Sequence, residues 1–114
     1  MNKNKIKQNY IDVKNDSSLE ERFYLSVKIL ATEMGSLNKR LFRCEDHLSP
    51  FFDKQFNNPE INKKFAYIEN VFKNKCMHYN GGDGGWLHCH WKESKKMAEN
   101  IFYIFDKINE IVNE

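Results

Sequence analysis

Long apolar runs, arginine and cysteine are all scarce in this sequence. No apolar run among its 114 residues approaches about 18, the length that a membrane-spanning helix needs. No apolar stretch of about 7–15 residues follows the lysine-rich start, so a secretory signal is not expected. The 3 cysteines are an odd number, and without such a signal they predict reduced thiols and a cytoplasmic location.

The scarcity of arginine argues against nucleic acid as a partner. The chain has 15 Lys but only 3 Arg, and its formal net charge is +2. Arginine is the side chain that recognises phosphates and bases through paired hydrogen bonds. Nucleic-acid-binding proteins also gather a marked basic excess on one face. Because acidic residues are interspersed almost everywhere here, we expect neither nucleic acid nor a membrane as a partner.

Apolar and aromatic residues are abundant enough for a folded core. The composition is 40% apolar and 14% aromatic, with 9 Phe, 5 Tyr and 2 Trp. Disordered chains have few aromatic residues, and a chain of this length fits one domain. No helical or strand periodicity holds through residues 1–17. We therefore predict a mobile N-terminal arm over 1–17 and a single helical domain over 18–114.

The first predicted helix spans residues 18–48. Ser18 and Glu21 have the spacing of a capping box, which marks a helix start. Apolar residues then recur every three or four positions as far as Leu48, in the pattern of a helix with one buried face. Gly35 and Ser36 interrupt the helix chemically, but the apolar phase continues through them. We predict one long helix, with a kink at 35–36 as the alternative.

Two further helices complete the predicted fold. Asn58 and Pro59 mark the start of a helix over 59–77, and a glycine-rich breaker follows at 80–85. The last helix covers 91–113. Three such helices pack best as an antiparallel bundle, so the predicted class is an all-α three-helix bundle. Because the helices differ in length, the first would leave apolar surface uncovered, which a second copy of the chain would cover in a dimer.

Cysteine and histidine are concentrated on both sides of the glycine-rich segment. They are ligands that zinc prefers, and a closed site needs four of them. One hypothesis is therefore a zinc-binding module over residues 76–90. In the alternative, Cys76 continues the apolar face of the helix, the glycines form a sharp turn, and Trp86 and Trp91 cap the end of the bundle. The spacing favours this alternative, because it matches none of the usual zinc motifs. The candidate ligands are Cys76, His78, His88, Cys89 and His90.

Arg40 and His47 form the second candidate site. They are seven residues apart, which places them two turns apart on one face of a helix. The segment resembles the Arg-x4–6-His motif of the HEPN family, small helical proteins that include metal-independent ribonucleases. The resemblance implies that Arg40 and His47 are a catalytic pair completed across a dimer. In the alternative interpretation Arg40 lies on a solvated face and His47 near a helix end.

The function that we expect is non-enzymatic: stoichiometric binding of another protein chain, as in adaptors, inhibitors and immunity proteins. Large aromatic side chains next to loops and glycines are typical anchors of protein interfaces, although each is also a candidate for the core. The predicted binding residues are Phe51, Phe52, Phe56, Trp86 and Trp91.

Overall fold

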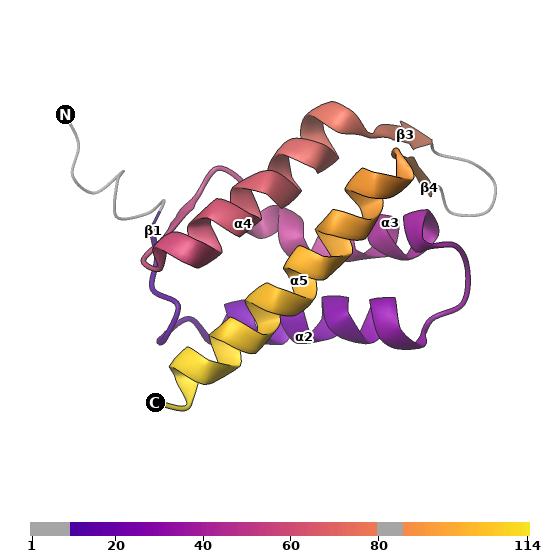
Figure 1. Cartoon of the computed structure of the whole chain (residues 1–114). Helices are drawn as coiled ribbons and strands as arrows, with labels where there is room; N and C mark the ends of the chain where they lie inside the picture. The colour runs from indigo at the N-terminus through magenta and orange to yellow at the C-terminus, as the bar shows by residue number, and fades with distance from the viewer. Residues whose placement is uncertain (1–9, 80–85) are drawn as a thin grey trace.

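Four α-helices form most of the fold in the computed structural model, which describes residues 10–79 and 86–114. In this part of the chain they are α2 (Ser17–Thr32), α3 (Leu37–Leu48), α4 (Pro59–Asn70) and α5 (Trp91–Val112). Helix α5 packs against α2 on one side and α4 on the other, while α3 packs against α2 (Figure 1). The prediction of a mostly helical fold is confirmed, but the helices number four rather than three.

The predicted single helix over 18–48 is wrong, because the chain reverses between α2 and α3. Glu33 leaves the helical region, and Gly35 has φ 109°, which strongly favours a residue without a Cβ atom. Ser36 then caps α3 by accepting a hydrogen bond from the Lys39 amide at 3.2 Å. The apolar phase continues through this turn because both helices present the same kind of face to one core.

The chain before α2 packs onto the helices. Strand β1 (Tyr10–Ile11) pairs in parallel with β2 (Gln55–Phe56). The amide of Val13 donates to Oδ1 of Asn57 at 3.0 Å, and both Ile11 and Val13 are buried. Residues 10–16 of the predicted arm are thus part of the folded body, while residues 1–9 lie outside the described residues.

The start of α2 also differs from the predicted capping box. The Asp16 carboxylate accepts hydrogen bonds from the amides of Ser18 at 3.1 Å and Leu19 at 3.2 Å. Asp16 is therefore the N-cap, two residues before Ser18.

A short hairpin joins α4 to α5. After α4 the chain forms one π-helical turn, η2 (Val71–Lys75), so the helix predicted over 59–77 ends two residues early. Strands β3 (Met77–Tyr79) and β4 (Trp86–His88) then pair antiparallel. The predicted breaker at 80–85 lies outside the described residues. The last helix, α5, matches its predicted range of 91–113 within one residue.

The cysteines do not fit the prediction of three reduced thiols. Cys76 and Cys89 flank the hairpin and form a disulfide. Cys44 is the free cysteine and is fully buried on α3. Because disulfides persist mainly in oxidising compartments, the thiol argument for a cytoplasmic location no longer holds.

Several phenylalanine rings pack against one another at one end of the core. Phe65 on α4 lies 5.2 Å from Phe56 and 6.0 Å from Phe23 between ring centroids. The connector between α3 and α4 contributes Phe51 within the 3-10 turn η1 (Ser49–Phe51), and Phe51 also contacts Phe23.

None of the described helices is long and apolar enough to cross a membrane.

Burial of Cys44 and the disulfide together predict how the thiols react. Burial raises the pKa of the Cys44 thiol to about 12, so almost no reactive thiolate forms near neutral pH. We expect a thiol reagent at pH 8 to label no cysteine in the native protein and one in urea. Mass spectrometry of the labelled chain checks this. Three labelled cysteines in urea without reductant would show that the disulfide does not form.

Candidate functional site

The start of α5 is fixed by contacts from the hairpin and from α3. The Cys76–Cys89 disulfide lies two residues before Trp91. The Ser94 hydroxyl donates to Oδ1 of Asn38 on α3 at 2.5 Å, and Nδ2 of Asn38 donates to the carbonyl of Cys89 at 3.4 Å. These bonds hold the first turn of α5, and Trp91 with it, in one position relative to α3.

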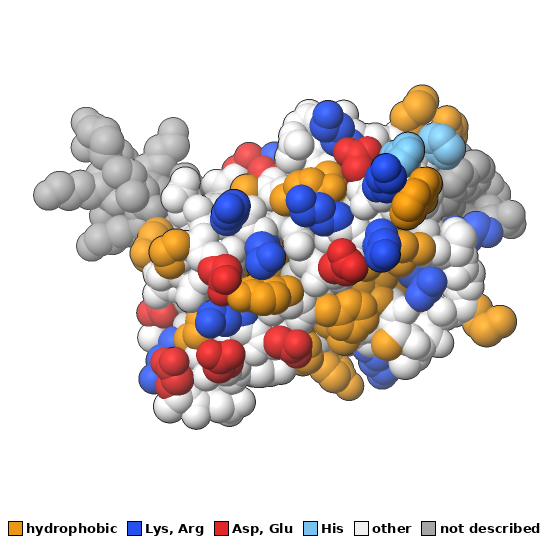
Figure 2. Space-filling view, viewed as in Figure 1, with side chains coloured by type: hydrophobic (Ala, Val, Ile, Leu, Met, Phe, Trp, Pro, Cys, Tyr) orange, Lys and Arg blue, Asp and Glu red, His pale blue; other side chains and the backbone are white. Residues whose placement is uncertain are grey.

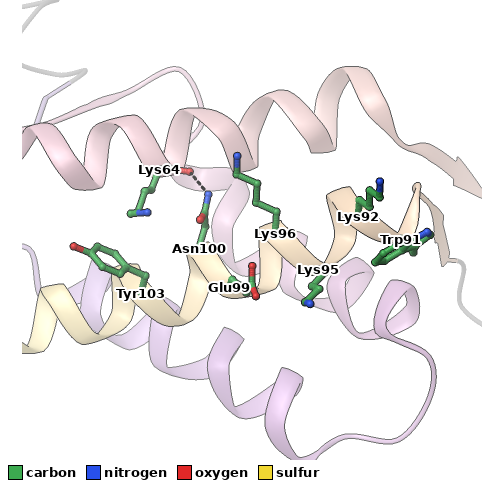
Figure 3. Close-up of a pocket in the computed structure, with 8 residues that line it drawn as sticks. All are labelled: Lys64, Trp91, Lys92, Lys95, Lys96, Glu99, Asn100 and Tyr103. Carbon is green, nitrogen blue, oxygen red and sulfur yellow. Dashed lines mark hydrogen bonds between the residues drawn. The ribbon is translucent and has the colours of Figure 1, made fainter.

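A groove runs between α4 and α5 on the side away from α3 (Figure 3). It consists of two adjoining hollows with volumes of about 530 and 410 Å³, and Lys64, Lys96 and Asn100 line both. We call it the α4–α5 groove. Its other lining residues are Glu60, Lys63, Tyr67, Trp91, Lys92, Lys95, Glu99 and Tyr103.

Lysine ammonium groups lie over the aromatic rings of the groove. Nζ of Lys64 is 4.4 Å from the centre of the Tyr103 ring, and Nζ of Lys96 is 4.6 Å from that of Tyr67. Attraction between a cation and the face of a ring holds such pairs together. Since Lys64 is on α4 and Tyr103 on α5, while Lys96 is on α5 and Tyr67 on α4, both pairs bridge the two helices.

The two groove tyrosines remain neutral at physiological pH. A hydrogen bond with Glu60 raises the pKa of Tyr103, and burial followed by the charge of Glu93 raises the pKa of Tyr67. Both hydroxyls therefore keep their protons. The Tyr103 proton is donated to Glu60, whereas the Tyr67 hydroxyl can donate to a ligand.

The groove carries a net positive charge. Five lysines line it against two glutamates. Figure 2 shows lysine side chains over α4 and the first half of α5, with hydrophobic side chains between them. Such a surface attracts a ligand that combines negative charge with apolar groups.

Trp91 is the exposed aromatic side chain at one end of the groove. Its side chain is 64% exposed, and its ring stacks on His90 with 5.9 Å between ring centres. His90 caps α5, because its Nδ1 accepts a hydrogen bond from the Lys92 amide at 3.2 Å. The indole is thus held on a rigid helix end while most of its surface stays open to solvent.

The other predicted binding residues lie elsewhere. Phe51 and Phe56 are 4% and 5% exposed and pack in the core, so their rings have no free surface for a partner. Phe52 is half-buried against Phe65 and Phe72. The side chain of Trp86 lies outside the described residues. Of the four predicted anchors whose side chains the structure describes, Trp91 is the exposed one.

Arg40 takes part in the turn between α2 and α3. Its guanidinium donates hydrogen bonds to the carbonyls of Leu30 and Gly35 and so binds the C-terminal end of α2. His47 is half-buried two turns further along α3, and no hydrogen bond in the described part of the chain joins it to Arg40. The arrangement of Arg40 is that of a residue stabilising a turn.

The five candidate zinc ligands are not brought together. Cys76 and Cys89 are bonded to each other, His78 pairs with Glu45 at 2.9 Å, and His90 caps α5. His88 is exposed on β4. No group of three or more metal-ligating side chains that could hold a metal ion occurs within residues 10–79 and 86–114.

The lysines and tyrosines of the groove were not among the predicted site residues. A signal for them was present, because Lys92, Lys95 and Lys96 are spaced by three and four residues, which places them on one side of a helix. A second signal was Asn100, a polar residue between the apolar seam positions Met97 and Ile101, and it is 7% exposed.

No protein-family model, curated protein or solved structure matches this chain.

Proposed function

We propose that the protein acts by binding one partner protein stoichiometrically through the α4–α5 groove, in an adaptor, inhibitor or immunity-like role. The observation that supports this best is Trp91, with 64% of its side chain exposed at the end of a lysine-lined hollow. Tryptophan is the residue most enriched among binding hot spots, and here it is preorganised by His90 and by the fixed start of α5.

The partner is another protein chain rather than a small molecule. Both hollows are open, and lysines with long flexible side chains form much of their lining. Small-molecule sites are enclosed and mostly apolar, with few polar groups. A second copy of this chain is the alternative occupant, which a measurement of molecular mass in solution distinguishes.

We expect Trp91→Ala to weaken partner binding by about 30-fold or more, the loss typical of a tryptophan hot spot. The tagged protein is purified from its own cells, and native mass spectrometry gives the mass and stoichiometry of the captured complex. The matched control is Met34→Ala, because the Met34 side chain is 88% exposed between α2 and α3, away from the groove.

The two variants together locate the interface. Loss of the partner from Trp91→Ala and its retention by Met34→Ala supports the proposal. Retention by Trp91→Ala at wild-type level contradicts it. A mass of two chains that returns to one chain in Trp91→Ala identifies the partner as a second copy.

A further inference from the structure

The charges and hydrogen-bonding groups of the α4–α5 groove define its partner more closely. We propose that the groove binds an acidic peptide segment that places a large apolar side chain against Trp91. This rests on the proposed function, since it specifies the chemistry of the partner at the same face.

The lysines of the groove are available to an acidic ligand. Lys63 and Lys64 come from α4, and Lys92, Lys95 and Lys96 come from α5, so both helices contribute positive charge to the lining. Lys92 and Lys96 point toward α4, whereas Lys95 points away from it (Figure 3). No ion pair involves any of these five within residues 10–79 and 86–114. Carboxylates of a bound peptide would therefore not break an existing ion pair. The contacts that Lys64, Lys92 and Lys96 already make are with the rings of Tyr103, Trp91 and Tyr67.

The floor of the groove offers a hydrogen-bond acceptor that suits a peptide backbone. Nδ2 of Asn100 donates to the carbonyl of Lys64 at 3.3 Å (Figure 3). Oδ1 of Asn100 accepts no hydrogen bond from the described residues, and it is not a fully buried unsatisfied atom, so it keeps some contact with solvent on a residue that is 7% exposed. A peptide amide N–H can donate to it whatever the side chain, whereas a phosphodiester backbone has no such donor.

The same face is poorly suited to single-stranded nucleic acid. Base stacking needs free aromatic faces, but Lys96 and Lys64 already lie over the Tyr67 and Tyr103 rings. Glu60 and Glu99 line the groove and would repel a continuous row of phosphates. Carboxylates spaced along a peptide can avoid these two glutamates. The Trp91 ring is stacked on His90 and has Nζ of Lys92 5.7 Å from its centre, so an apolar side chain would contact the exposed part of the indole without needing a free stacking face.

Fluorescence anisotropy with three short probes of equal length tests the proposal. The first is a fluorescein-labelled peptide of alternating glutamate and alanine around one leucine, the second replaces each glutamate by glutamine, and the third is single-stranded oligouridylate. We expect the full chain to bind the glutamate peptide at least about tenfold more tightly than the glutamine peptide, with affinity falling as salt rises. Oligouridylate should bind more weakly than the glutamate peptide.

Charge reversal in the groove should remove this binding. Changing both Lys64→Glu and Lys96→Glu is expected to weaken binding of the glutamate peptide at least about tenfold. The control is Lys28→Glu with Lys39→Glu, which changes the net charge equally at exposed positions on α2 and α3 and should change affinity less than about twofold. If circular dichroism shows that the groove pair does not fold, the same pair changed to glutamine is used, with the same direction expected.

Three results would overturn the proposal: equal affinity for the glutamate and glutamine peptides, equal loss in the groove and control pairs, or tighter binding of oligouridylate than of the glutamate peptide. These outcomes are separable from failure of the proposed function. If Trp91→Ala loses a cellular partner while the glutamate peptide does not bind, the protein interaction stands and the acidic chemistry is wrong.

Discussion

Replacing Cys76 and Cys89 together by serine is expected to lower the free energy of unfolding by about 3 kcal/mol, the figure for a closed loop of similar length. The two cysteines are 13 positions apart, and their bond removes conformations from the unfolded chain. In the native state it also ties η2 to the first turn of α5. Thermal unfolding should show a fall in Tm on the order of 10 °C.

Reductant provides the matched control for this prediction. Wild-type protein in dithiothreitol should unfold near the Tm of the double serine variant, and dithiothreitol should not change the Tm of that variant. Cys44 does not complicate the comparison, because it is buried and free in both proteins. A wild-type Tm that does not respond to reductant would show that the bond is absent or does not stabilise the fold.

Phe56→Ala is expected to lower the free energy of unfolding by about 3–5 kcal/mol, as for other fully buried phenylalanines. The Phe56 ring is 5% exposed and lies 5.2 Å from Phe65 and 6.4 Å from Phe51 between ring centroids. Removing it leaves a cavity between α4 and the connector. Urea denaturation followed by circular dichroism measures the loss.

Trp91→Ala is the comparison for Phe56→Ala, because both residues were predicted as binding anchors. Its side chain is 64% exposed, so the free energy of unfolding should change by less than about 0.5 kcal/mol. The pair thus separates a core aromatic from an interface aromatic. A stable Phe56→Ala variant, with a denaturation midpoint equal to the wild type, would place Phe56 on the surface after all.

The amino-acid sequence predicts the helices that obey one uninterrupted pattern. The seam of α5 and the Asn58–Pro59 start of α4 are local signals, and both helices begin where those signals place them. The reversal at Gly35 was not predicted as a break, because the apolar period on either side of it is in phase. Periodicity measures which residues are buried, and two helices that fold back onto one core bury the same residues as one straight helix.

Contacts between distant segments explain what the sequence could not predict. Pairing of Tyr10–Ile11 with Gln55–Phe56 has no local signal, since either dipeptide alone would fit a loop. Pairing of Cys76 with Cys89 depends on the hairpin that brings them together. The α4–α5 groove likewise exists only once the two helices pack. Trp91 could be predicted because a large aromatic residue next to a glycine-rich segment is a local signal.

The parallel pairing of β1 with β2 sets an order of events during synthesis. Val13 binds the side chain of Asn57, which is 44 residues later in the chain. At about 5–20 residues per second, the ribosome adds Asn57 about 2–9 seconds after Val13. Helix–coil relaxation takes microseconds, so α2 samples its helix many times while its N-terminal flank stays undocked until Asn57 is made. The first described residues of the chain therefore reach these contacts only after the first half of the chain has been made.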